Sequence, residues 1–190
     1  MNVVTHLLVG WTLAEHTTKS PRDRALITAA AVLPDLDGLG LIVDAAAPTF
    51  GWTVQWYERF HHVLLHGIPG ALLYTALFAI FTQERWRAAC LILVSYHLHL
   101  LGDLLGSRGS GPSDIWPIHY LEPLSRELTV SWSGQWALSG WQNMTLTVVL
   151  MAYVFFLAVR RGYSPVGLIS ARADAVFVET LRRRFRSSAT

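Results

Sequence analysis

The chain has 190 residues, a length that suits one domain better than two. Hydrophobic residues make up 52% of the sequence and charged residues only 15%, whereas ordinary soluble domains carry about 25% charged residues. With a mean hydropathy of +0.35, this composition favours a membrane protein over a water-soluble helical bundle, the main alternative. The formal net charge of +2 is too small to indicate a nucleic-acid partner.

Five apolar segments are expected to form helices. They are Val3–Ala14, Ala25–Leu33, Val63–Phe81, Trp86–Leu105 and Met144–Val159. The last three approach the length of about 20 residues that a membrane span needs, and the first two are too short to span alone. Proline biases the preceding residue away from helix, so "PDLDG" after Leu33 is expected to be a loop or turn. We predict an all-α bundle with about three to five membrane-embedded helices.

The segments divide the chain into one membrane-embedded domain, residues 1–165, and a basic amphipathic tail, residues 166–190. Within the tail, residues 172–186 are expected to form an Arg-rich helix that lies on a membrane surface. The N-terminus lacks the basic stretch and the small-residue cleavage site of a signal peptide, so residues 3–14 are expected to stay in the mature protein. The single cysteine, Cys90, has no internal disulfide partner and is expected to be a small core residue.

Basic residues mark one end of several segments, in "KSPRDR", "QERWR", Arg160–Arg161 and the tail. Such residues are enriched on the cytoplasmic side of membrane proteins. The opposite segment ends carry most of the histidines and aspartates. We therefore expect a multi-pass inner-membrane protein whose polar site faces the non-cytoplasmic side.

The stretch "HLHLLGD" places His99 and Asp103 four residues apart, and such residues share one face of a helix. A histidine and an aspartate inside an apolar helix are costly to bury unless something pairs them. A metal-binding pair and a structural hydrogen bond both explain this pattern. In "LPDLDG", Asp35 and Asp37 suit turn chemistry as well as cation binding, and only partners elsewhere in the chain decide between the two.

The stretch "FHHVLLHGIPG" holds three histidines within six positions. His62 and His66 share a helical face, whereas His61 and His66 converge only if His61 lies at or before the first turn. Neutral imidazole is the commonest metal ligand in proteins, so this cluster favours ligation. His119, in "WPIHY", could line the same site.

All these candidates fall at one end of the predicted bundle. The candidate metal ligands are His6, Asp35, Asp37, His66, His99, Asp103 and one of His61 and His62. Mixed histidine and carboxylate ligands favour zinc, manganese or iron over calcium or magnesium. Seven ligands are too many for one four-coordinate zinc, so the sequence predicts two ions bridged by a carboxylate, with zinc preferred.

In the order and spacing of its motifs, the chain resembles the membrane-bound metal-dependent hydrolases, also described as LexA-binding, inner-membrane-associated hydrolases. The matching features are "THLLVG" with His6, "LPDLD", a His-x4-His element of His61 and His66, and "YHLHLLGD" followed by "WP". That family is in turn distantly similar to zinc-dependent phospholipase C and to single-strand-specific zinc nucleases. The resemblance implies a phospholipase-C-like helical core and phosphoester hydrolysis.

The chain departs from the family around His66. The family pattern reads His-Arg-x-x-Thr-His-Ser, whereas this chain has His62, Leu65 and Gly67 in place of the arginine, threonine and serine. The resemblance favours His61 as the ligand that accompanies His66, and helix geometry favours His62. His62 is then expected to be an extra ligand or a proton donor.

The expected function is a metal-dependent hydrolase that acts on a lipid headgroup or another phosphoester, through water activated by two ions. Asp35 and His62 are the candidate catalytic residues. Membrane lipid and a small-molecule or lipid phosphoester are the expected partners. A haem protein that uses His66 with His97 or His99 is one alternative. A non-catalytic membrane scaffold held together by a structural metal is another.

Overall fold

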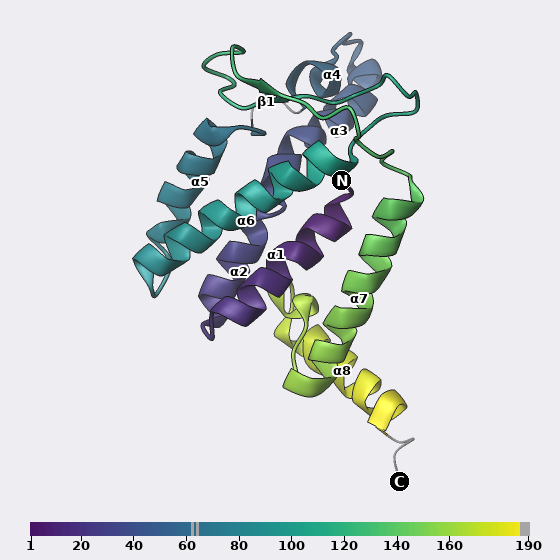
Figure 1. Ribbon diagram of the computed structural model, residues 1–190. Helices are drawn as coiled ribbons and strands as arrows, with labels where there is room; N and C mark the ends of the chain where they lie inside the picture. Colours follow the sequence, from purple (N-terminus) through teal and green to yellow (C-terminus); the bar gives the residue numbers. More distant parts are fainter. Residues whose placement is uncertain (62, 64, 187–190) are drawn as a thin grey trace.

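The computed structural model describes residues 1–61, 63 and 65–186, and it is mostly helical, as predicted (Figure 1). Its α-helices are α1 (Val3–Thr17), α2 (Pro21–Ala30), α3 (Gly40–Ala46), α4 (Trp56–Phe60), α5 (Ile68–Ala79), α6 (Arg85–Gly106), α7 (Trp141–Arg161) and α8 (Ala171–Arg186). The 3₁₀-helices are η1 (Leu33–Leu39), η2 (Ala47–Phe50) and η3 (Pro165–Leu168). A short antiparallel pair joins β1 (Ile118–His119) to β2 (Thr129–Val130), with Ile118 opposite Val130. This pair was not predicted.

Polar and glycine residues set the ends of the helices. The Asn2 side chain accepts a hydrogen bond from the Thr5 amide (2.9 Å) and caps α1. Ser20 caps α2 in the same way, and Pro21 begins that helix. Gly162 adopts a φ of 89° and ends α7, because an L side chain rarely tolerates that conformation.

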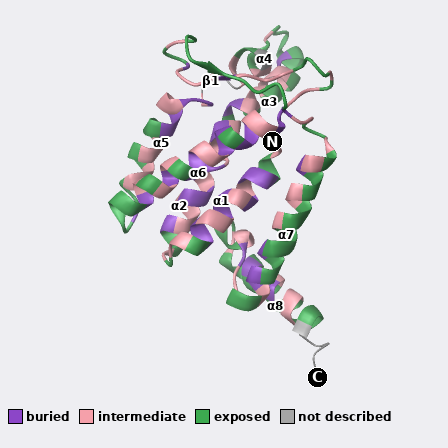
Figure 2. Cartoon of the chain, in the orientation of Figure 1, coloured by how far each residue is buried: buried purple, intermediate pink, exposed green. Residues whose placement is uncertain are grey.

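Helix α1 lies at the centre and packs against α2, α6 and α7 (Figure 1). Its contact with α2 is very close at Gly10, where a Cβ atom would lie 2.4 Å from the Cβ of Ala31. Trp11 of α1 is fully buried against Val154 and Leu157 of α7. Figure 2 shows buried residues concentrated on α1, α2 and α6 and many exposed residues along α7. These contacts fix α1 within the bundle, and His6 near its start contacts Asp103 near the end of α6.

Two helices in the described part of the chain, α6 and α7, are long and apolar enough to cross a membrane. Helix α2 and the segment Leu33–Phe50, bent by 53°, make a third candidate span if the pair counts as one. The expectation for Val63–Phe81 was wrong, because its helix, α5, begins only at Ile68 and has 12 residues. That length is too short for a span.

Two further expectations are corrected. "PDLDG" is neither a loop nor an isolated turn but part of η1, which begins at Leu33, separated from the end of α2 by two residues, because Pro34 fits the first turn of a helix. Cys90 is exposed on α6 rather than buried in the core. Because α6 is a candidate span, we expect an apolar side chain on its outer face to contact lipid rather than water.

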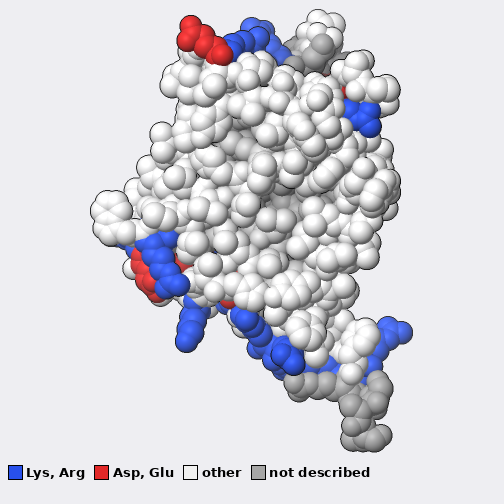
Figure 3. Space-filling model, in the orientation of Figure 1, with Lys and Arg blue, Asp and Glu red and all other residues white. Residues whose placement is uncertain are grey.

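The outer surface has an apolar belt between charged ends. On the face drawn in Figure 3, charged side chains gather at the two ends and the middle carries almost none. Large apolar side chains on α7 point outward, among them Val148 and Val149, and Arg160 and Arg161 close this helix. Such a belt is typical of a lipid-facing surface. The predicted helix over 172–186 is confirmed as α8, and its contact with a membrane surface stays a prediction, as does the domain boundary at 165.

Candidate metal centre

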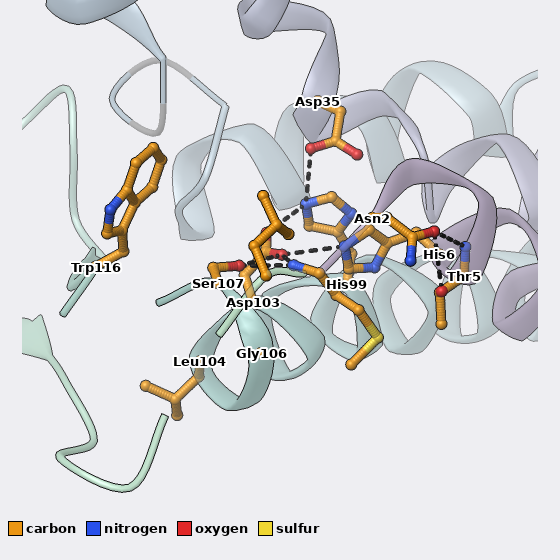
Figure 4. Close-up of polar contacts among 12 residues, drawn as sticks. Asn2, Thr5, His6, Asp35, His99, Asp103, Leu104, Gly106, Ser107 and Trp116 are labelled. Carbon is orange, nitrogen blue, oxygen red and sulfur yellow. Dashed lines mark hydrogen bonds and ion pairs between the residues drawn. The ribbon is translucent and has the colours of Figure 1, made fainter. Parts of the chain in front are cut away.

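Four of the predicted ligands come together at one end of the bundle. Asp35 comes from η1, His66 from the turn before α5, and His99 and Asp103 from the last two turns of α6. One ligand atom of each lies within 4.8 Å of those of the other three. His66, His99 and Asp103 are buried and Asp35 is half-buried. Figure 4 shows how Asp35, His99 and Asp103 point toward one another.

The distances match the spacing of ligands around one ion. The Nε2 atom of His99 lies 3.0 Å from Asp103 Oδ2 and 3.3 Å from His66 Nε2. His66 Nε2 lies 3.5 Å from the same carboxylate oxygen. Ligands at about 2.1 Å from a tetrahedral zinc are about 3.4 Å apart. Asp35 stands slightly farther out, with Oδ1 3.8 Å and 3.9 Å from the Nε2 atoms of His99 and His66.

The hydrogen bonds on the far side of each ring determine which nitrogen can bind a cation. His99 Nδ1 donates to the carbonyl of Ala31 (3.0 Å), because a carbonyl can only accept. His66 Nδ1 donates to Asp37 Oδ2 (3.0 Å). In a neutral ring each Nε2 atom then carries the lone pair, and both Nε2 atoms face Asp103 Oδ2, which has no hydrogen-bond partner within the described residues. A cation between groups that converge in this way stabilises them, and the residues fit a divalent metal ion.

The charges around His66 also favour a cation in the cluster. Burial alone would lower the pKa of His66, but its contacts with Asp103 and Asp37 outweigh burial and raise the pKa to about 9. The two carboxylates thus favour a positive charge at His66, which either a proton on the ring or a metal ion in place of that proton can supply.

The other predicted ligands lie around the four clustered residues and contact them directly or through Asp37. Asp37 accepts hydrogen bonds from His61 Nδ1 (2.8 Å) and His66 Nδ1 (3.0 Å), so it orients both rings. His6 Nε2 contacts Asp103 Oδ1 (3.0 Å), and its ring stacks on His99 with 3.8 Å between ring centres. Gly102 leaves room for this ring, since a Cβ atom there would lie 2.9 Å from His6 Cε1.

Sequence reasoning missed three contacts of the cluster. The amino group of Met1 pairs with Asp103 Oδ1 and lies 2.6 Å from Ser107 Oγ, which itself donates to that oxygen (2.9 Å). The spacing of four residues between Asp103 and Ser107 could have indicated the second contact. The Ala31 carbonyl carries no signal in the sequence. The Met1 amino group and the Ser107 hydroxyl both donate to Oδ1 of Asp103, which leaves Oδ2 for the cluster.

The haem alternative fits this arrangement poorly. Axial histidines need the porphyrin ring between their nitrogens, whereas carboxylate oxygens lie within 3.0–3.9 Å of the Nε2 atoms of His66 and His99. Both nitrogens of His97 are engaged elsewhere, with the Leu93 carbonyl (2.7 Å) and the Tyr120 hydroxyl (2.7 Å). His97 therefore ties α6 to the strand region.

The structure explains one difference between this chain and the hydrolase pattern that it resembles in sequence. A Cβ atom at Gly67 would lie 2.6 Å from the Tyr120 carbonyl oxygen, so a serine would not fit there without a shift. The carbonyl of Leu65 accepts a hydrogen bond from the Tyr96 hydroxyl, which anchors the turn that carries His66. His62, a candidate catalytic residue, lies outside the described residues.

A cavity of about 480 Å³ lies beside the cluster, and both His61 and His119 line it. His119 thus lies where the sequence suggested, near the site. Neither this cavity nor a larger one of about 1240 Å³, bounded by Asp44 and Arg59 among others, is lined by any of the four clustered residues. The smaller cavity is the better candidate for access to the cluster, because the ring of His61 on its wall lies 5.7 Å from the ring of His66, centre to centre.

A family model described as YdjM inner membrane protein matches residues 1–168, which include the whole cluster and both cavities. The chain belongs to the YdjM inner membrane protein family. Membership in the YdjM family, together with the apolar helices, confirms the expectation of an inner-membrane protein. No curated protein and no solved structure matches the chain. The match ends before α8, so the family pattern covers the bundle and the site but not this last helix.

Proposed function

We propose that this member of the YdjM family is a membrane-bound, metal-dependent hydrolase of phosphoesters. In this proposal His66, His99 and Asp103 hold one divalent ion and Asp35 lies beside it. The observation that carries the proposal is the convergence of two imidazole Nε2 atoms on a buried carboxylate oxygen that accepts no hydrogen bond in the described part of the chain. Zinc fits best, because two histidines and a carboxylate are a common ligand set of catalytic zinc.

A divalent ion at this position supplies Lewis acidity, which activates water and stabilises the negative charge that develops on the phosphoester. The chain's own residues would bind, orient and accept the proton. Asp35 suits the last role, because its side chain is 15% exposed while those of the other three are at most 3% exposed. Its Oδ2 atom has no hydrogen-bond partner in the described part of the chain. A carboxylate that stands slightly off the ligand triangle can accept a proton from water.

The second ion that the sequence predicts stays a prediction. His6, Asp37 and His61 would have to supply much of its coordination, but His6 and Asp37 already contact the cluster and His61 contacts Asp37. The four-residue cluster alone accounts for one ion. The ratio of metal to protein in purified material therefore tests the proposal of one ion against the prediction of two.

The place of the cluster supports a substrate at headgroup depth. Asp103 lies three residues before the end of α6, about 4.5 Å along the helix axis, at the end opposite Arg85 and Arg87. In this proposal the arginine-rich end is cytoplasmic, since basic residues mark that side. The cluster then faces the other side, where it would meet a lipid headgroup or a soluble phosphoester.

Two variants test the division of roles. Asp35→Asn should keep the metal content of the wild-type protein and lose turnover of phosphomonoesters and phosphodiesters, because the proton acceptor is gone. His99→Ala should lose both the metal and the turnover. Loss of metal in Asp35→Asn would show that Asp35 is mainly a metal ligand. Full turnover in that variant would refute its role as the base.

A second candidate function is a structural metal that joins elements far apart in the sequence. The specific observation in its favour is that the cluster ties η1, the turn before α5 and α6 together. A screen of phosphomonoesters and phosphodiesters with added zinc, manganese or iron separates the two functions. The structural reading predicts that chelation lowers the unfolding temperature and that no substrate is turned over.

A further inference from the structure

The cavity of about 480 Å³ is built around His61. This ring stacks on Tyr57, with 4.4 Å between ring centres, and meets Trp116 edge to face at 6.0 Å. Its Nδ1 atom contacts Asp37, which in turn orients His66. The cavity wall is therefore two hydrogen bonds away from a proposed metal ligand. His119 and Arg126 line the same cavity.

The guanidinium of Arg126 is held at this cavity by a buried carboxylate. Its Nε donates to Glu122 Oε1 at 2.5 Å, and the Glu122 side chain is 4% exposed whereas that of Arg126 is 72% exposed. This is the only hydrogen bond of the Arg126 guanidinium within the described residues, so its two terminal nitrogens can still donate. A planar guanidinium can bind one anion through each edge, and an anchored one loses less freedom when it does.

The wall carries hydrogen-bond donors that suit an anion. The two terminal nitrogens of Arg126 donate with a permanent positive charge, and the His119 ring lies on the same wall, where its Nδ1 atom contacts the Thr129 hydroxyl (2.9 Å). Asp114 is the carboxylate on the wall, and the indole Nε1 of Trp116 donates to it (3.3 Å). Tyr57, Trp116 and Ile115 add apolar surface for the part of a ligand that carries no charge.

We propose that this cavity binds the phosphate group of the substrate and that Arg126 is a specificity-determining residue for it. This inference rests on the proposed function. It adds where the phosphate of the substrate binds and that this group must be negatively charged. The phosphate can belong to a lipid headgroup or to a soluble ester, because the cavity lies beyond the end of α6, outside the candidate spans.

The first test measures binding of inorganic phosphate to the zinc-loaded full chain in detergent, by titration calorimetry. Arg126→Gln should weaken phosphate binding by about 10- to 100-fold, the usual cost of one charge-assisted hydrogen bond. Arg126→Lys should keep part of the affinity. Arg59→Gln is the matched control, because it removes the same charge from the larger cavity, and it should bind phosphate as the wild type does. Equal zinc content in all four proteins shows that the site itself is intact.

The second test measures turnover of a soluble aryl phosphate and of a phospholipid with a phosphomonoester headgroup in nanodiscs. Arg126→Gln should raise KM by the same factor on whichever substrate is used, and that substrate identifies the source of the phosphate. Wild-type phosphate affinity in Arg126→Gln, equal loss in Arg59→Gln, or no phosphate binding by the wild type would overturn the inference. Phosphate binding through Arg126 without turnover of either ester would instead refute the proposed hydrolysis and leave the cavity assignment standing.

Discussion

Asp37 offers a sharp test of how the metal centre is organised. Its two oxygens accept hydrogen bonds from His61 Nδ1 (2.8 Å) and His66 Nδ1 (3.0 Å). Asp37→Asn keeps the shape but offers one acceptor and one donor, so one ring loses its partner or moves its hydrogen to Nε2. A hydrogen on Nε2 of His66 blocks that atom as a ligand. Residues that orient metal ligands contribute about 10- to 100-fold to affinity, which equals about 1.4–2.8 kcal/mol.

The assay is a competition for zinc between the purified protein and a chromophoric chelator. Asp44→Asn is the matched control, because Asp44 also accepts two hydrogen bonds, from the amides of Trp56 (2.7 Å) and Tyr57 (2.8 Å), but lies outside the cluster. We expect Asp37→Asn to weaken zinc binding by about 10- to 100-fold and Asp44→Asn to leave it unchanged. Unchanged affinity in Asp37→Asn would refute the orienting role. Complete loss, as in His99→Ala, would make Asp37 a direct ligand, as the sequence predicts.

Two further predictions concern the packing that supports the site. Gly10→Ala places a Cβ atom 2.4 Å from Ala31 Cβ, so it should cost about 1–3 kcal/mol of stability and weaken zinc binding, because the Ala31 carbonyl orients His99. Gly111→Ala, whose nearest neighbour would lie at 3.8 Å, should change neither in the same thermal and zinc titrations. At the opposite end, Glu15 pairs with Arg161 and with Arg24 (2.7 Å). Glu15→Gln should destabilise the bundle by about 1–3 kcal/mol in thermal unfolding while the metal content stays that of the wild type, and a loss of metal would contradict the separation of the two ends.

The parts of the site that could be predicted are those set by local spacing. His99 and Asp103 lie one helical turn apart, and the structure brings them together with Asp35 and His66 from distant segments. The sequence could not show which candidates face the cluster and which orient the rings of the ligands. Asp35 and Asp37 are two residues apart, yet one faces the cluster and the other faces the backs of two histidine rings, because η1 turns them to different sides.

The features that the sequence did not predict depend on packing between distant segments. The Ala31 carbonyl reaches His99 only because α1, α2 and α6 pack closely, and a backbone group leaves no mark in the residue pattern. The length of α5 was overestimated because hydrophobicity alone does not reveal that Gly67 lies against the Tyr120 carbonyl and that the helix begins after it. The exposure of Cys90 was missed because lipid-facing and core positions have the same composition in a membrane helix.

Elemental analysis of the purified protein tests the central claim most directly. The account predicts about one zinc, manganese or iron ion per chain in the wild type, removable by chelation and restored by added metal. It also predicts a ratio near zero for His99→Ala at an unchanged helical content. A wild-type protein without stoichiometric transition metal, or a His99→Ala variant that keeps its metal, would contradict the claim that these residues form a metal centre.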